Sequence, residues 1–290
     1  MSDVMLQISQ ISKAFGGVQA LDKVDLEIRR GEIHCLAGGN GSGKSTLIKI
    51  ISGYYKADSG TISIEGHDHS KLNPIEAIMS GIQVIYQDFS VFPNLTVAEN
   101  IAMYDAVASK QKLQNWKRTA ETAKNTMDKL GITIPPDALV EELPVADRQL
   151  VAICRAMVHD AKLIIMDEPT TALTKKEVKR LFEIIADLKK NGITILFVSH
   201  KLDEVFEISD SITILRSGEN VISCPASEMT EEKFAYYMTG RHFDNQELAD
   251  NKKRTYGEEV LSVENLSAPG FEDISFKLHK GEILGVTGQL

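Results

Sequence analysis

The 290-residue sequence predicts an α/β fold, in which a mostly parallel β-sheet carries helices on both faces. Short apolar runs bounded by turn residues predict buried strands, and segments with apolar residues every three or four positions alternate with them. The clearest strands span 33–37, 81–86, 163–166 and 193–198, and the clearest helix spans 175–190. Parallel strands need long crossover connections, which such helices would supply.

The first part of the chain alternates apolar and polar residues with a period of two. Residues 5–8 and 24–28 follow this pattern, and 61–64 is a further apolar run between glycines. The alternation predicts strands with one buried and one solvated face. The N-terminal region is therefore expected to be mainly β structure.

The segment 88–159 has helical patterns instead. Thr96 and Glu99 have the spacing of a capping box, which marks the start of a helix. Further helices are predicted at about 114–130 and 145–158. The segment is expected to form an α-helical subdomain inserted into the α/β core.

Composition limits the functional class. A net charge of −9 argues against non-specific nucleic-acid binding as the main task. No apolar run approaches the ~20 residues of a membrane helix, and the start of the chain lacks the pattern of a signal peptide. The cysteines Cys35, Cys154 and Cys224 are odd in number and far apart, which suits reduced thiols in a cytosolic protein.

A glycine-rich loop lies between the predicted strand 33–37 and an apolar run, 47–51, that starts a helix. It fits the phosphate-binding pattern G-x-x-x-x-G-K-[ST] in full. Its residues are Gly38, Gly39, Asn40, Gly41, Ser42, Gly43, Lys44, Ser45 and Thr46. Small residues let backbone N–H groups turn toward phosphates, Lys44 would reach the outer phosphates, and Ser45 would place its hydroxyl on Mg²⁺. A chance glycine-rich turn would not account for the flanking strand and helix, so the loop predicts nucleotide binding.

Two carboxylates end the buried strand 163–166. Asp167 would lie beside the phosphate site and hold Mg²⁺, directly or through water, and Glu168 would polarise an attacking water. An acidic turn at the end of a strand is the ordinary alternative. The preceding phosphate-binding loop favours the functional interpretation.

Three other residues are candidates for the nucleotide site only because the motifs above are present. Gln87 follows a predicted strand and has an amide that can coordinate Mg²⁺ or the attacking water, and His200 follows the strand 193–198 and can hydrogen-bond a terminal phosphate. Phe15 can stack on an adenine ring. Taken singly, an ordinary loop glutamine and a structural histidine are the preferred interpretations of the first two, and a half-buried turn aromatic is an equally good interpretation of Phe15.

In their order and spacing, these motifs resemble the ATP-binding cassette (ABC) ATPases over nearly the whole chain. The resemblance implies a P-loop NTPase fold with a parallel sheet core, an antiparallel β subdomain and an inserted α-helical subdomain. It also implies that Phe15 stacks on adenine, that Gln87 lies in the Q-loop, that Glu168 is the catalytic glutamate and that His200 is the switch histidine. In the D-loop, residues 171–174, Thr174 replaces the usual Asp.

The C-terminal part of the chain repeats the N-terminal part at an offset of 250 residues. Residues 274–278 match 24–28, Gly281-Glu282-Ile283 matches Gly31-Glu32-Ile33, and Gly288 matches Gly38. The repeat predicts a longer protein with two tandem copies. The expected organisation is a first cassette at 1–240 with its helical subdomain at 88–159, a linker at 241–259, and the truncated start of a second cassette at 260–290.

One motif departs from the family pattern. Where the family has the signature Leu-Ser-Gly-Gly-Gln, this chain has residues 143–147, Leu-Pro-Val-Ala-Asp. Pro144 has neither hydroxyl nor N–H, and Ala146 adds a methyl group where close approach is needed. The family signature faces the nucleotide of the opposite cassette, so the hypothesis is that the site on Lys44 hydrolyses ATP while the opposite site is slow or only binds ATP. In the alternative, both sites hydrolyse.

Tandem cassettes and the run 15–21 are similar to those of bacterial monosaccharide importers of the ribose, galactose, xylose and autoinducer-2 type. The resemblance implies an ATP- and Mg²⁺-dependent ATPase at the cytoplasmic face of the membrane. Its expected partners are a second cassette in the same chain or in a homodimer, transmembrane permease subunits and, indirectly, an external sugar-binding protein, with no nucleic acid. The alternatives are a soluble tandem-cassette ATPase acting on ribosomes or nucleic acid, and a regulatory nucleotide-binding module without turnover.

Overall fold

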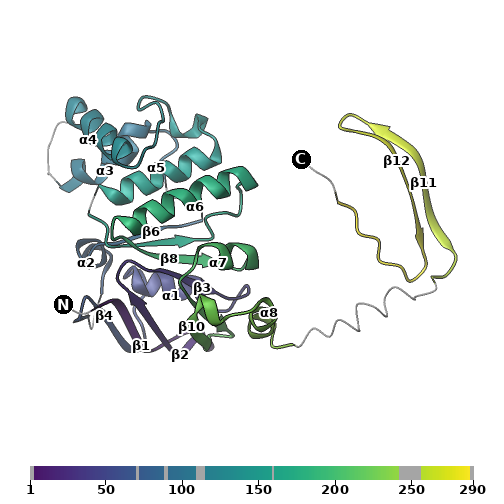
Figure 1. Ribbon diagram of the computed structural model, residues 1–290, viewed down its shortest axis with the longest axis horizontal. Helices are drawn as coiled ribbons and strands as arrows, with labels where there is room; N and C mark the ends of the chain where they lie inside the picture. Colours follow the sequence, from purple (N-terminus) through teal and green to yellow (C-terminus); the bar gives the residue numbers. More distant parts are fainter. Residues whose placement is uncertain are drawn as a thin grey trace. The chain divides into compact units, whose positions relative to one another are not determined.

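The computed structural model describes residues 3–69, 72–87, 91–108, 115–158, 160–241 and 256–287. The chain divides into two compact units, Met1–Arg241 and His242–Leu290 (Figure 1). Within the described residues, no helix combines the length and the apolar character needed to cross a membrane.

The core of the first unit is a six-stranded sheet in the order β10-β9-β3-β8-β7-β6. Its neighbours from β9 to β6 pair in parallel, and only β10 is antiparallel to its neighbour. The strands are β3 (Ile33–Ala37), β6 (Ile82–Ile85), β7 (Leu163–Asp167), β8 (Thr194–Ser199), β9 (Ser211–Arg216) and β10 (Glu219–Pro225). The predicted parallel α/β core is confirmed.

Helices cover both faces of this sheet, as Figure 1 shows. Along β7, Ile164 and Met166 point into the core beneath α5 (Val145–Met157) and α6 (Lys175–Lys190). Their neighbours Leu163 and Ile165 point to the other face, beneath α1 (Lys44–Ile51). Burial on both faces explains why the sequence shows continuous apolar runs here instead of alternation. Beside β3 and β9, α7 (Leu202–Ile208) and α8 (Glu231–Thr239) enclose a smaller core.

An antiparallel sheet in the order β2-β1-β4-β5 packs over α1. Its strands are β1 (Val4–Phe15), β2 (Val18–Arg29), β4 (Ser59–Ile64) and β5 (His67–His69). The sequence predicts shorter strands at 5–8 and 24–28, because β-bulges interrupt the alternation. At these bulges Gln10 (φ 53°) and Lys23 (φ 49°) adopt left-handed conformations. The expected antiparallel β subdomain is confirmed.

The helical part of the first unit contains α3 (Val97–Ala108), α4 (Trp116–Lys129) and α5, and the short α2 (Pro74–Met79) precedes β6. The predicted capping box is present: the Thr96 backbone N–H donates to Glu99, and the Glu99 N–H donates to Thr96 Oγ1. Ile101, Ala123 and Leu150 join these helices to the core. The predicted limits of this subdomain, Asp88 and His159, lie outside the described residues.

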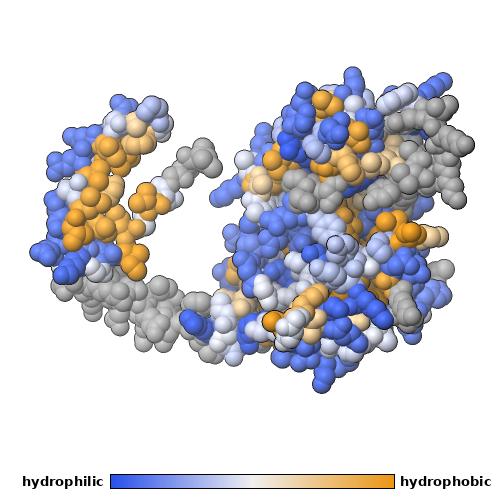
Figure 2. Space-filling view, turned by 180° about the vertical axis from the view of Figure 1, so that it is seen from behind, coloured by the Kyte–Doolittle hydropathy of each residue, from blue (hydrophilic) through white to orange (hydrophobic). Residues whose placement is uncertain are grey.

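The second unit contains a β-hairpin, β11 (Glu259–Ala268) and β12 (Phe271–His279). Most of the predicted linker (242–255) and the predicted counterpart of the first P-loop glycine, Gly288, lie outside the described residues. Glu259, which the prediction assigned to the linker, is the first residue of β11. Figure 2 shows apolar side chains along one face of this hairpin.

The hairpin β11–β12 has the strand register of β1–β2. The pair Leu261↔Leu278 corresponds to the pair Leu6↔Ile28. Equivalent residues are 255 positions apart between β1 and β11, and 250 positions apart between β2 and β12. Further matched pairs are Ile8↔Leu26 with Val263↔Phe276, Ile11↔Val24 with Leu266↔Ile274, and Lys13↔Leu21 with Ala268↔Phe271. The left-handed residues also correspond, Asn265 (φ 50°) to Gln10 and Asp273 (φ 55°) to Lys23. The second hairpin thus reproduces the bulges of the first.

Candidate functional site

The parallel sheet brings four of the predicted motifs to one edge. The adjacent strands β3, β8, β7 and β6 run in the same direction, and the last residues of neighbouring strands are in register or offset by one residue. The loop 38–46 follows β3, His200 follows β8, Asp167 and Glu168 end β7, and Gln87 follows β6. Motifs far apart in the sequence therefore meet at the carboxyl ends of the strands, where open α/β sheets bind ligands.

The loop 38–46 cannot hold larger residues at two of its glycines. A Cβ at Gly38 would collide with the side chain of Ser42. A Cβ at Gly43 would lie 2.6 Å from Leu21 Cδ2 and 2.8 Å from the Ala20 carbonyl oxygen, and Gly43 has a φ of 105°. The loop is therefore packed tightly against the start of β2.

Polar groups in this loop suit a bound anion. Helix α1 begins at Lys44, and its N-cap Gly43 has no side chain to satisfy the first backbone N–H groups. Within the described part of the chain, the buried Ser42 Oγ has no hydrogen-bond partner. Free donors at a helix N-terminus next to a lysine form a phosphate-binding arrangement, so the loop fits the phosphates of a nucleotide.

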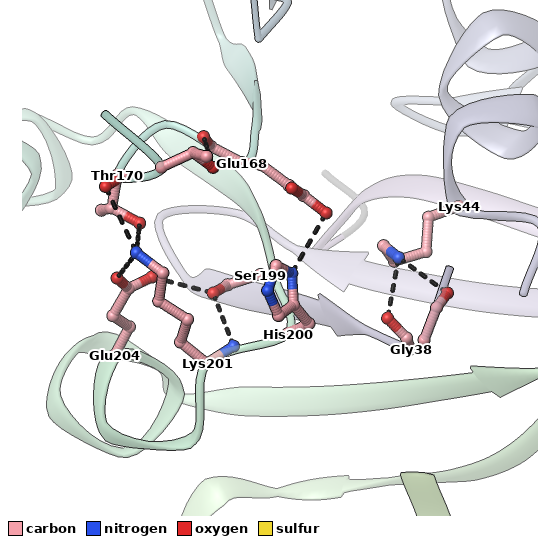
Figure 3. Close-up of polar contacts among 10 residues, drawn as sticks. Gly38, Lys44, Glu168, Thr170, Ser199, His200, Lys201 and Glu204 are labelled. Atoms are coloured by element: carbon pink, nitrogen blue, oxygen red, sulfur yellow. Dashed lines mark hydrogen bonds and ion pairs between the residues drawn. The ribbon is translucent and has the colours of Figure 1, made fainter. Parts of the chain in front are cut away.

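Lys44 is held by its own loop. Its ammonium donates to the carbonyl oxygens of Gly38 at 2.7 Å and of Gly39 at 3.1 Å (Figure 3). Burial lowers the pKa of Lys44, and the nearby carboxylates of Glu168 and Asp167 oppose this shift. Because Lys44 is partly desolvated, its ammonium would attract the negative charge of a polyphosphate more strongly than a fully solvated lysine would.

Asp167 and Ser45 supply the oxygen ligands that Mg²⁺ prefers. Asp167 is half-buried at the end of β7, and Ser45 is exposed in the first turn of α1. Burial raises the pKa of Asp167, and the charge of Glu168 raises it further, against the attraction of Lys44 and Lys49. Such a carboxyl group would be stabilised in its charged form by a metal cation. Gln87 is exposed at the same sheet edge, and no hydrogen bond within the described residues joins it to the other predicted site residues.

Glu168 has a backbone conformation that favours glycine, with a φ of 49°. Its N–H donates to the Val198 carbonyl at 3.1 Å, and its carbonyl accepts a hydrogen bond from Thr171 Oγ1 at 3.1 Å. Left-handed backbone at a non-glycine residue costs about 1–3 kcal/mol and occurs at functional sites as well as at bulges such as those of β1–β2. Here it turns the side chain toward β8, where Glu168 Oε1 lies 3.2 Å from His200 Nδ1 (Figure 3).

A partly buried hydrogen-bond network holds the chain on both sides of His200. Ser199 Oγ donates to Glu204 at 2.8 Å and accepts from the Lys201 N–H at 3.1 Å. The Lys201 ammonium contacts Glu204 at 2.9 Å and donates to the carbonyl and hydroxyl oxygens of Thr170 at 3.2 Å. This network links the turn after Glu168 to the turn after β8. Sequence reasoning missed Thr170, Lys201 and Glu204. Lys201 and Glu204 are ordinary charged residues shortly after His200, and Thr170 belongs to no motif used in the sequence prediction.

Phe15 lies at the end of β1 and is 42% exposed. Its ring meets the ring of Tyr55, with centroids 5.1 Å apart and planes inclined by 61°. The loop 38–46 is tied to the same hairpin through Gly218, which donates to the Ser42 carbonyl and accepts from the Asp22 N–H. Sequence reasoning missed Tyr55, which is separated from Phe15 by the whole of α1.

The segment 143–147 forms the start of α5. Pro144 is the N-cap and makes no side-chain cap, and Asp147 places a carboxylate in the first turn. Arg148 folds back to donate to the carbonyl oxygens of Leu143 at 2.9 Å and Glu141 at 2.7 Å. No hydrogen bond within the described residues connects this segment to the loop 38–46.

Residues 21–171 match the family model of the ABC transporter. The chain belongs to the ABC transporter family of ATP-binding cassettes. This membership confirms the resemblance inferred from the motifs.

Curated relatives in the ABC family match almost the whole chain. It is 39% identical over 286 residues to the ribose import ATP-binding protein RbsA of Bacillus subtilis, covering 98% of this chain and 58% of that protein. It is 40% identical over 289 residues to the galactose/methyl galactoside import ATP-binding protein MglA of Escherichia coli O157:H7, covering 99% and 56%. The chain thus spans little more than half the length of these relatives.

A solved structure of the ADP conformation of MJ1267, an ATP-binding cassette of an ABC transporter, shares the fold. The TM-score is 0.71 with 27% sequence identity, over 87% of this chain and 100% of that one.

Proposed function

We propose that this chain is the ATP-binding and ATP-hydrolysing part of a bacterial ABC importer for a sugar or a related small carbohydrate. The observation that carries the proposal is the meeting of the loop 38–46, Asp167 and the Glu168–His200 pair at one edge of the sheet. The loop would hold the phosphates, Lys44 would neutralise their charge, and Phe15 would stack on the adenine.

Mg²⁺ would be held by Ser45 and Asp167, with Gln87 joining them as the nucleotide binds. When bound, it would neutralise charge on the phosphate oxygens and help to orient them.

Hydrolysis would use the pair next to the loop. As a water oxygen bonds to the γ-phosphorus, the bond to the β–γ bridging oxygen breaks, and ADP leaves with that electron pair. The Glu168 carboxylate would orient the water and accept its proton. His200 Nδ1, 3.2 Å from Glu168, would keep this carboxylate in place and stabilise the transferring group together with Lys44.

The import function rests on relatives whose names specify ribose and galactose import. The proposed partners are permease subunits at the cytoplasmic face of the membrane, with Gln87 and the helical subdomain passing movement to them. An external sugar-binding protein would act indirectly. The net charge of −9 and these relatives favour import over the alternative of a soluble ATPase on ribosomes or nucleic acid.

The repeated hairpin supports the proposed domain organisation, a first cassette at 1–240 followed by the start of a second at 260–290. The two ATP sites of such a pair would be unequal. The first turn of α5 would face the opposite nucleotide without the signature serine and with the carboxylate of Asp147, which repels phosphate. The site on Lys44 would then perform most of the turnover.

The test is Glu168→Gln in the full-length protein, reconstituted with its permease in vesicles. We expect the variant to lose about 100-fold or more in ATP turnover, because the proton acceptor is removed while the shape of the side chain is kept. Phosphate release and sugar uptake are the measurements, and Glu183→Gln, on the exposed face of α6, is the matched control. Retention of most turnover would refute the assignment. Recovery of ribosomes in place of permease during purification would refute the import function.

A further inference from the structure

Phe15 is supported by residues that no motif includes. It stands at the end of β1, next to Gly16 and Gly17, which both have positive φ angles. The backbone of such a turn does not by itself fix the position of the ring. If the ring became fixed only when a ligand bound, the lost conformational entropy would weaken binding. Contacts from the segment after α1 hold the ring instead.

The first support is Tyr55. Its ring lies 5.1 Å from the ring of Phe15 in an edge-on arrangement. Tyr55 is itself half-buried against the core beneath the antiparallel sheet, and its backbone N–H donates to the Lys49 carbonyl at 2.9 Å. The Lys49 ammonium lies 5.5 Å from the centre of the Tyr55 ring. Tyr55 is therefore a fixed surface against which Phe15 packs.

The second support is Asp58, which fastens the strand just before Phe15. Its carboxylate accepts hydrogen bonds from the Ala14 N–H and the Lys13 ammonium, both at 2.7 Å, and its own N–H donates to the Ser12 carbonyl at 2.9 Å. The Lys13 ammonium also lies 5.3 Å from the centre of the Phe15 ring. The Asp58 side chain thus holds Lys13 and Ala14, the two residues that lead directly to the aromatic ring, and its backbone holds Ser12.

These supports leave part of the ring available, since Phe15 remains 42% exposed. The hairpin that carries it also packs on Gly43 of the phosphate-binding loop. We propose that Tyr55 and Asp58 are positioning residues for nucleotide-base recognition, which hold Phe15 as a preformed stacking surface for the adenine ring. This inference rests on the proposed function, because it assumes that the loop 38–46 binds a nucleotide.

The test compares two ligands that share phosphates but differ in the base, namely ATP and inorganic tripolyphosphate, each with Mg²⁺. Binding of both to the 290-residue chain is measured by titration calorimetry. We expect Tyr55→Leu and Asp58→Ala each to weaken ATP binding about 3- to 10-fold, in line with the strength of aromatic pairs, and to leave tripolyphosphate binding unchanged. Tyr55→Phe, which keeps the ring, restores the affinity for ATP.

The matched control is Asp25→Ala. Asp25 joins the two strands of the same hairpin at the bulge around Gln10. Its carboxylate accepts hydrogen bonds from the Gln10 N–H at 2.8 Å and from the Gln10 side chain at 2.6 Å. Because these bonds lie away from Phe15, this variant should bind both ligands as the wild type does. Thermal unfolding of each variant reports whether the fold is kept.

A double-mutant cycle separates positioning from direct contact with the base. If Tyr55 acts through Phe15, then Tyr55→Leu should have no further effect on ATP binding once Phe15 is Ala. Equal losses for both ligands, no loss for either, or additive effects in the cycle would overturn the inference. A wild type that binds tripolyphosphate as tightly as ATP would also overturn it while leaving the proposed function intact. A wild type that binds neither would refute both.

Discussion

The two hairpins of this chain, β1–β2 and β11–β12, share a register but differ in their turns. Both have matched pairs and left-handed residues at equivalent bulges. The first hairpin continues beyond the Lys13↔Leu21 pair to Phe15 and its glycines, whereas the second is five residues shorter and turns directly after the matched pair, at Pro269 and Gly270. Strand pairing is therefore encoded locally in both copies, and the aromatic surface is an addition to only one of them.

The hairpins also differ in how their apolar faces are covered. Leu6 and Val24 are fully buried beneath α1 and β4. Their counterparts Leu261 and Ile274 are 46% and 43% exposed. An isolated two-stranded hairpin is marginally stable in water. The comparison teaches that the same local pattern forms a core only where a helix and a further strand complete the layer.

The largest expected difference is between Leu6→Ala and Leu261→Ala, and it concerns the free energy of unfolding. In the first hairpin the change leaves a cavity in a closed core and should lower the free energy of unfolding by about 2–5 kcal/mol. In the second hairpin the side chain is already half exposed, so we expect a change within about 0.5 kcal/mol. Urea unfolding of the two variants measures both values. Similar losses would show that the second apolar face is covered as well as the first.

Phe15→Ala against Phe271→Ala is the next contrast, because each hairpin has a phenylalanine at or next to its turn. Loss of a base-stacking ring should weaken ATP binding by about 1–3 kcal/mol for Phe15→Ala. Phe271→Ala should leave ATP binding unchanged, although Phe271 is exposed to a similar degree, 44%. Titration with ATP provides the measurement. Comparable losses in the two variants would remove the functional distinction between the turns.

The smallest expected difference is between Glu32 and Glu282, and it concerns how stability depends on pH. Burial raises the pKa of Glu32, but hydrogen bonds from His34 and the Arg29 N–H outweigh it and leave the pKa below its ordinary value of 4.5. A lowered carboxyl pKa stabilises the fold above the ordinary value, and this contribution is lost as the pH falls through the folded value.

Glu32→Gln should therefore flatten the loss of stability of the first unit between about pH 5 and pH 3, by about 1 kcal/mol or less. Glu282→Gln, at the equivalent position of the second hairpin, should leave that acid-unfolding curve unchanged. Unfolding followed at several pH values tests the pair. An unaltered slope for Glu32→Gln would assign the acid sensitivity to other groups.

Most of the fold could be predicted because the signals are local. Continuous apolar runs identified the buried strands β3, β7 and β8, and the Thr96–Glu99 spacing identified a helix start. The full lengths of β1 and β2 could not be predicted, since bulges at Gln10 and Lys23 break the alternation. The Thr174–Glu177 capping box at the start of α6 was not predicted, although its residues have the same spacing as Thr96 and Glu99.

By itself, the sequence determined the glycine-rich loop 38–46, the acidic end of β7 and the repeat near the C-terminus, because each is a pattern of neighbouring residues. The tertiary structure alone decided which distant residues meet. Glu168 reaches His200 because β7 and β8 are adjacent parallel strands and a left-handed residue turns the side chain across. Tyr55 reaches Phe15 because α1 returns the chain to the antiparallel sheet. Sequence separation carries no information on such distances, which depend on strand order and packing.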